Sequence, residues 1–181
     1  MTTSQRPPKI DIKQAGQAGL QLAGQDQLAN YERLMEETAG LGAQNPLNWS
    51  VRATLQPDAQ GLPQVWLYLS LSTSLPQTCQ RCLGPVAVPL TIERAFRFVE
   101  TEAQAELEDD ASPEDLLVLS RDFDLAALIE DEVLMDLPVV PRHDVCPVPV
   151  KLAAMDADFE EVAPKPSPFA VLAGLKVPGK H

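Results

Sequence analysis

The sequence predicts an α+β fold: an antiparallel β meander, which could curl into a barrel-like sheet, packed with two or three short helices. Three long runs of alternating apolar and polar residues lie in the centre of the 181-residue chain, and turn-forming residues separate them. Apolar residues recur at helical spacing on both sides of these runs. Seventeen prolines, gathered near the ends and in the second half, favour an extended C-terminal segment. We therefore expect a single α+β domain over residues 1–150 and an extended tail over 151–181.

The first half of the chain is expected to begin with an edge strand over residues 9–13, where polar and apolar residues alternate. A short amphipathic helix is predicted from Gln25 to about Glu37, because apolar residues recur there every three or four positions. The three period-two runs cover residues 49–55, 65–75 and 86–98. They predict an antiparallel meander with one buried face.

The second half is expected to open with an acidic, mobile loop over residues 100–115, followed by a short strand at 116–119. A helix capped by Asp122 or Asp124 should then run to Leu137, where Pro138 stops it. The prolines beyond it favour an extended path. A short anchoring helix is expected in the tail over residues 168–173, with Phe169 and Leu172 as its apolar face.

The balance of charge indicates a basic partner. Fourteen Lys and Arg residues face twenty-six Asp and Glu residues, which leaves a net charge of −12. Such a chain repels nucleic acid at long range and attracts basic proteins. The alternative is that the acidic residues only maintain solubility.

The chain is expected to stay in the cytoplasm. It contains no apolar run long enough to span a membrane, and its first residues lack the apolar core of a secretory signal. Its three cysteines are an odd number, which suits reduced thiols better than a disulfide framework.

Two short motifs contain residue types that bind metals. Cys79 and Cys82 form a C-x-x-C pair, and His143 and Cys146 form a second pair at the same spacing. Together they could supply a structural zinc site, provided that the fold brings the two halves together. A turn with reduced thiols and a redox dithiol are the alternatives. The redox interpretation is disfavoured because Gly84 follows where a thioredoxin-like helix would continue.

Carboxylates interrupt the apolar arc of the helix predicted to end at Leu137. Glu132 and Asp136 project into an arc that includes Leu128 and Met135. A buried carboxylate must be paired, protonated or placed at a rim. It could form an acidic socket for a partner's Lys or Arg, or an internal pair, which we favour, with Arg94, Arg97 or Arg142.

Three stretches resemble the YceD family, also called large ribosomal RNA subunit accumulation proteins. They are Cys79–Leu83, then Asp124–Leu125 with Ile129–Glu132 and Leu137–Asp144, and finally Ser167–Lys176 in the tail. The resemblance covers roughly residues 8–176. It implies a factor that supports the synthesis, processing or stability of large-subunit (23S) ribosomal RNA. The genes of this family often neighbour that of a small, basic ribosomal protein, which suits an acidic chain.

We therefore expect a non-enzymatic ribosome biogenesis factor that binds a basic large-subunit ribosomal protein or a pre-ribosomal particle. Neither a membrane nor a small-molecule substrate is expected. The predicted contact residues lie in the matched motifs and have no evident core role: Arg81, Glu130, Glu132, Pro138, Pro141 and His143. Direct rRNA binding is the first alternative, and it would require the few arginines to converge on one patch. A thiol redox protein using Cys79 and Cys82 is the second.

Overall fold

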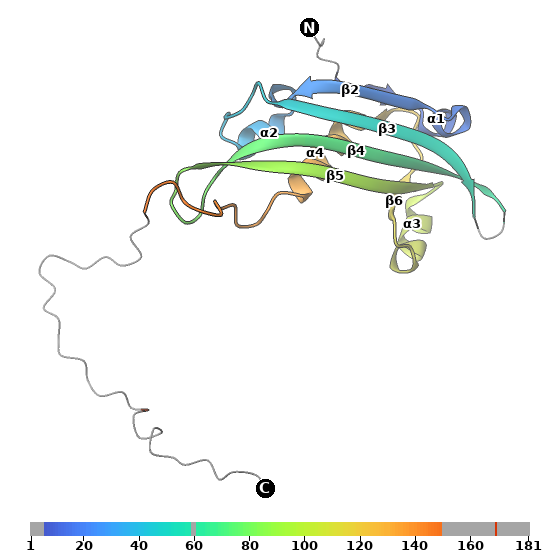
Figure 1. The fold of residues 1–181 in the computed structure, drawn as a ribbon. Helices are drawn as coiled ribbons and strands as arrows, with labels where there is room; N and C mark the ends of the chain where they lie inside the picture. Colours follow the sequence, from blue (N-terminus) through green and yellow to red (C-terminus); the bar gives the residue numbers. More distant parts are fainter. Residues whose placement is uncertain (1–5, 59–60, 150–168, 170–181) are drawn as a thin grey trace, which may run out of the picture. The chain divides into compact units, whose positions relative to one another are not determined.

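The computed structural model describes residues 6–58, 61–149 and 169 (Figure 1). Its centre is a five-stranded sheet in the order β2-β3-β4-β5-β6. The first four strands pair antiparallel, whereas β6 runs parallel to β5. Their bounds are Gln21–Gln27 for β2, Pro46–Pro57 for β3, Pro63–Thr78 for β4, Pro85–Val99 for β5 and Asp115–Val118 for β6. The predicted α+β meander is confirmed, but β2 and β6 do not pair, so the sheet is open and not barrel-like.

One face of the sheet is buried because apolar residues occupy every second position of the long strands. In β4, Leu67, Leu69 and Leu71 are almost completely buried. Neighbouring strands place apolar residues opposite them, such as Val51 opposite Leu69 and Ile92 opposite Leu71. Ser70, Ser72 and Ser74 occupy intervening β4 positions and point to the other face, as the period-two geometry of a strand requires.

Short helices cover the buried face. These are α1 (Ile12–Ala18), the 3₁₀ turn η1 (Leu28–Asn30), α2 (Glu32–Glu37) and α4 (Leu125–Met135). Ile12, Leu28, Leu34 and Ile129 are fully buried and join the sheet residues in a single hydrophobic cluster. The core therefore lies between the sheet and these helices.

Two predicted elements at the start of the chain differ from the structure. The helix predicted from Gln25 begins only after η1, because the backbone of residues 25–27 pairs with β3 as part of β2. The predicted edge strand is limited to β1 (Lys9–Ile10), which pairs with β7 (Phe123–Asp124). It ends there because the Asp11 side chain accepts a hydrogen bond from the Gln14 amide and caps α1.

The prediction of an acidic loop over 100–115 is wrong. Residues of this stretch form α3 (Glu102–Glu108) and the 3₁₀ turn η2 (Asp109–Ala111). The Thr101 side chain caps α3, and Glu108 accepts a hydrogen bond of 2.7 Å from Arg97. The strand predicted after it is confirmed as β6. It is parallel to β5 because α3 and η2 form the crossover that a parallel pair requires.

The predicted helix before Pro138 is confirmed as α4, and its cap is Asp124, whose carboxylate accepts from the Ala126 and Ala127 amides. Met135 was expected in the apolar arc but is 70% exposed, whereas Leu134 and Leu137 pack against the core. The helix expected in the tail falls outside the described residues, apart from Phe169. No helix in the described part of the chain is long and apolar enough to cross a membrane.

Candidate metal centre

The C-x-x-C motif lies in the tight turn that joins β4 to β5. The Cys79 amide donates to the Gly84 carbonyl at 2.9 Å, and the Leu83 amide donates to the Cys79 carbonyl at 2.8 Å. Leu83 adopts the left-handed conformation with φ of 60°, which lets the chain reverse direction within this short span. The turn thus places the thiols of Cys79 and Cys82 close together.

The second motif lies in the proline-rich segment that follows α4. This segment is irregular and is held against the turn by hydrogen bonds. The Gln80 amide donates to the Pro141 carbonyl at 2.8 Å. The Arg81 guanidinium donates to the His143 carbonyl at 2.8 Å and to the Asp144 carbonyl at 3.2 Å. These contacts bring residues together that are more than 60 positions apart in the chain.

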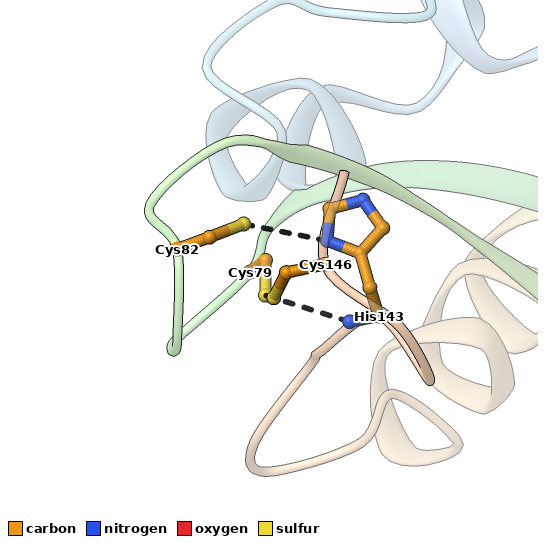
Figure 2. Close-up of side chains that lie close together, drawn as sticks. All are labelled: Cys79, Cys82, His143 and Cys146. Carbon is orange, nitrogen blue, oxygen red and sulfur yellow. Dashed lines mark hydrogen bonds between the residues drawn. The ribbon is translucent and has the colours of Figure 1, made fainter. Parts of the chain in front are cut away.

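All four predicted metal ligands converge (Figure 2). The Sγ atoms of Cys79, Cys82 and Cys146 and a ring nitrogen of His143 lie within 4.8 Å of one another. Between the two segments, Cys79 Sγ lies 4.0 Å from Cys146 Sγ, and Cys82 Sγ lies 3.4 Å from His143 Nδ1. All three cysteines are free thiols, since 4.0 Å is about twice the length of a disulfide bond.

The electrostatics of the centre favour the thiolate at Cys79 and the protonated thiol at Cys82. Burial raises the pKa of Cys79, but backbone hydrogen bonds from Cys82 and His143 outweigh burial and lower that pKa to about 5. The Gly84 amide lowers the pKa of Cys82, but burial and the adjacent sulfurs outweigh that amide, so this pKa is raised. The thiolate is the form that binds metal ions, and the lowered pKa of Cys79 favours that form.

Arg81 lies between the two segments and contacts the third sulfur. Its Nε donates to Cys146 Sγ at 3.1 Å, in addition to its bonds to the carbonyls of His143 and Asp144. A guanidinium keeps its charge at all relevant pH values, so it stabilises negative charge on the cluster. The role of Arg81 as a contact residue for a partner stays a prediction, and in the structure Arg81 connects the two halves of the centre.

The internal ion pair expected for Glu132 is confirmed, and its partner is Arg94. The Glu132 side chain is buried and accepts a hydrogen bond of 3.2 Å from Arg94 Nε. Asp136, the other carboxylate predicted in the apolar arc, is exposed at the end of α4. The pair therefore ties α4 to β5 within the fold.

Glu130 has a role that the sequence did not suggest. Its carboxylate accepts from the backbone amides of Arg33 and Leu34 at 2.8 and 3.3 Å, and from Arg33 Nε at 3.1 Å. It therefore caps the first turn of α2 from a different helix. Nothing in the local sequence of either helix indicates this contact, because 97 positions separate Glu130 from Arg33.

The two predicted proline contacts differ in exposure. Pro138 is exposed after α4, whereas Pro141 is buried beside the β4–β5 turn. Pro141 was predicted as a partner contact because it had no evident core role. Its burial shows that this reason is wrong. His143 is half-buried because its ring faces the sulfurs.

The fold and the centre define a small α+β protein whose β4–β5 turn is joined to a proline-rich segment by a cluster of three cysteines and one histidine. The family described as "Large ribosomal RNA subunit accumulation protein YceD" matches residues 67–176, a range that includes all four clustered residues. This range is more than half of the chain, so the chain belongs to the YceD family.

A curated relative supports this assignment. The large ribosomal RNA subunit accumulation protein YceD of Haemophilus influenzae is 37% identical over 101 residues, which cover 54% of this chain and 58% of the relative. The match thus spans somewhat more than half of the relative's length. No solved structure matches the chain.

Proposed function

We propose that this protein acts in ribosome biogenesis and supports the accumulation of large-subunit ribosomal RNA without being an enzyme. Membership of the YceD family carries this proposal. The proposed mechanism is the binding of a basic large-subunit ribosomal protein, or of an assembly intermediate that contains one. The net charge of −12 supports a basic partner, because opposite charge speeds association and favours the correct partner.

An exposed acidic surface supports the same mechanism. Glu102, Glu106, Asp109 and Asp110 are exposed on α3 and η2. We call these four residues the α3 acidic surface. Arg97, on β5, forms an ion pair with Glu108 at the end of α3 and so connects α3 to the sheet. The α3 acidic surface would thus present several carboxylates on a folded element to a basic segment of the partner.

Internal contacts of the arginines favour a protein partner over direct RNA binding. Arg94 pairs with Glu132, and Arg97 pairs with Glu108. Arg81 donates to Cys146 Sγ and to the His143 carbonyl. Three of the arginines that an RNA-binding patch would require therefore already contact acceptors within the fold.

The remaining predicted contacts would extend the partner surface near the cluster. Arg81 in the β4–β5 turn and Pro138 in the proline-rich segment are exposed, and His143 in the same segment is half-buried. Glu130 and Glu132 would act indirectly, because their carboxylates are held within the fold. A metal at the cluster would therefore have a structural role in this proposal, since it would position the segment and would not perform chemistry.

Affinity capture from growing cells tests the mechanism. The full chain is captured with and without ribonuclease, and the bound proteins and RNA are identified. We expect a basic large-subunit ribosomal protein that remains bound after ribonuclease. Recovery of ribosomal RNA alone, and its complete loss after ribonuclease, would overturn the protein-contact mechanism in favour of direct RNA binding.

Matched charge variants locate the surface. The triple variant Glu102→Gln, Glu106→Gln, Asp109→Asn removes three of the four charges of the α3 acidic surface and should reduce capture of the basic protein. A control with Glu32, Glu36 and Glu37, all exposed on or beside α2, changed to Gln removes the same number of charges. Equal loss of capture in both variants would show that total charge, and not the α3 surface, controls binding.

A further inference from the structure

We propose that Cys79, Cys82, His143 and Cys146 bind one Zn²⁺ ion in a closed tetrahedral site that holds the proline-rich segment on the β4–β5 turn. The proposal is independent of the role in ribosome biogenesis. It rests on the positions of the four ligand atoms, on the charge that they bring together and on the way in which the segment is attached.

The distances between ligand atoms fit a single tetrahedral ion. With Zn–S bonds of about 2.3 Å and Zn–N bonds of about 2.0 Å, tetrahedral angles place two sulfurs about 3.8 Å apart and a sulfur and a nitrogen about 3.5 Å apart. The corresponding distances here are 4.0 Å between Cys79 Sγ and Cys146 Sγ and 3.4 Å between Cys82 Sγ and His143 Nδ1. Every ligand atom lies within 4.8 Å of every other, so movements of about 1 Å would bring the widest pair to the tetrahedral distance.

The chemistry of the ligands selects the metal. Three sulfurs and one imidazole nitrogen are soft or intermediate donors, which Mg²⁺ and Ca²⁺ avoid and Zn²⁺ prefers. Tetrahedral sites made of cysteine and histidine are the usual structural zinc sites of proteins. The set is complete without water, which distinguishes it from catalytic zinc sites that keep one position open.

Charge also favours a dication over a metal-free cluster of thiolates at this point. Three thiolates brought this close together repel one another, and a dication leaves only one net negative charge when the histidine is neutral. Arg81 offsets that remaining charge, because its Nε lies 3.1 Å from Cys146 Sγ. We therefore assign Arg81 as a positioning residue of the site. The backbone amide of His143, 3.4 Å from Cys79 Sγ, supplies a further hydrogen bond to sulfur.

The attachment of the proline-rich segment explains why a metal is needed. After α4, residues 136–149 form no helix or strand, so no regular backbone pairing holds them. Apart from three hydrogen bonds to backbone carbonyls, their polar contacts with the β4–β5 turn are made by the cluster residues. One ion would join Cys79 to Cys146, 67 positions apart in the chain, and Cys82 to His143, 61 positions apart. It would hold the segment in place of the backbone hydrogen bonds that a strand would form.

The test measures metal content in the full chain, purified without a histidine tag and without chelator. Mass spectrometry of the metals should find about one zinc per chain, retained through dialysis. X-ray absorption at the zinc edge should give three sulfur ligands and one nitrogen ligand. Cobalt added to the metal-free chain should produce the absorption bands of a tetrahedral thiolate site.

Variants assign the ligands. Cys82→Ser and His143→Ala should each weaken zinc binding at least about tenfold. His143→Cys should retain about one zinc, because four cysteines also form a tetrahedral site. His181→Ala, which removes the only other histidine of the chain, should have no effect. Arg81→Gln should keep the metal but bind it more weakly.

Several outcomes would overturn the proposal. Wild-type protein without zinc that also gives no tetrahedral cobalt spectrum would exclude the site. Zinc that remains in both Cys82→Ser and His143→Ala would place the metal elsewhere. The cobalt spectrum and the ligand count of the wild-type chain keep the test decisive even if a cysteine variant fails to fold.

Discussion

Replacing Arg94 with Ala tests whether the buried carboxylate of Glu132 depends on its partner. Arg94 Nε lies 3.2 Å from Glu132 Oε2, a separation at which opposite charges attract by about 5 kcal/mol at an effective dielectric constant of about 20. Water reduces this value because the Arg94 side chain is 47% exposed, whereas that of Glu132 is only 6% exposed. The variant leaves an unpaired charge in the core, so we expect a loss of about 2 kcal/mol in the free energy of unfolding at neutral pH.

The pH dependence identifies the carboxylate as the cause. Burial raises the pKa of Glu132 above its usual value, and Arg94 opposes that shift. Removing Arg94 therefore raises this pKa further. A carboxyl group whose pKa is higher in the folded state binds its proton more tightly when folded. The loss in Arg94→Ala should thus be full above the raised pKa and shrink as the pH falls through it.

Urea unfolding of the full chain, at neutral pH and at about pH 5, measures both effects. The double variant Arg94→Ala, Glu132→Gln should recover at least half of the loss at neutral pH, because glutamine resembles the protonated carboxyl group. Arg121→Ala, a change at an exposed arginine, should stay within about 0.5 kcal/mol of wild type. A double variant as unstable as Arg94→Ala, with a loss that does not change with pH, would refute this reasoning.

Three further predictions concern α2, α1 and the metal centre. Glu130→Ala should destabilise the chain by about 1–2 kcal/mol in urea unfolding, because the cap of α2 loses its acceptor; no change would mean that water replaces the cap. Gly16→Ala should lower the free energy of unfolding by about 1–3 kcal/mol, because an added Cβ would lie 2.8 Å from Val65 Cγ1. Gln17→Ala, on the exposed side of α1, should leave the free energy of unfolding unchanged. Equal effects of the two variants would contradict the close packing of Gly16. Removing zinc with a chelator should speed hydrogen exchange of the Gln80 amide, which bonds the proline-rich segment, by about tenfold or more. Amides of central β4 should not change, and a uniform increase would indicate global unfolding instead.

Periodicity was enough to predict the sheet but not its edges. The alternation in β3, β4 and β5 reflects burial of one face, and that cause acts on every second residue of a strand. Residues 25–27 carry no such alternation, and only pairing with β3 makes them part of a strand. Similarly, Leu116 and Leu117 were expected in a strand, but their parallel direction depends on the crossover through α3.

The charged residues show a similar division. The position of Glu132 within an apolar helix face predicted a buried, paired carboxylate, because the cost of burying a lone charge is general. Which arginine forms the pair depended on the position of α4 against β5, and it is Arg94. The cap that Glu130 provides for α2 could not be predicted, because each helix by itself contains no signal of the other.

The sequence by itself determined the α+β class, the buried face of the meander, the family motifs and the four residue types able to bind a metal. These follow from local causes: strand period, helix capping and the chemistry of thiol and imidazole groups. Only the tertiary structure decided that Cys79 and Cys82 meet His143 and Cys146 and that Arg81 joins the two halves. The physical reason is that contacts across more than 60 residues depend on how the sheet and α4 pack, which no short stretch of sequence encodes.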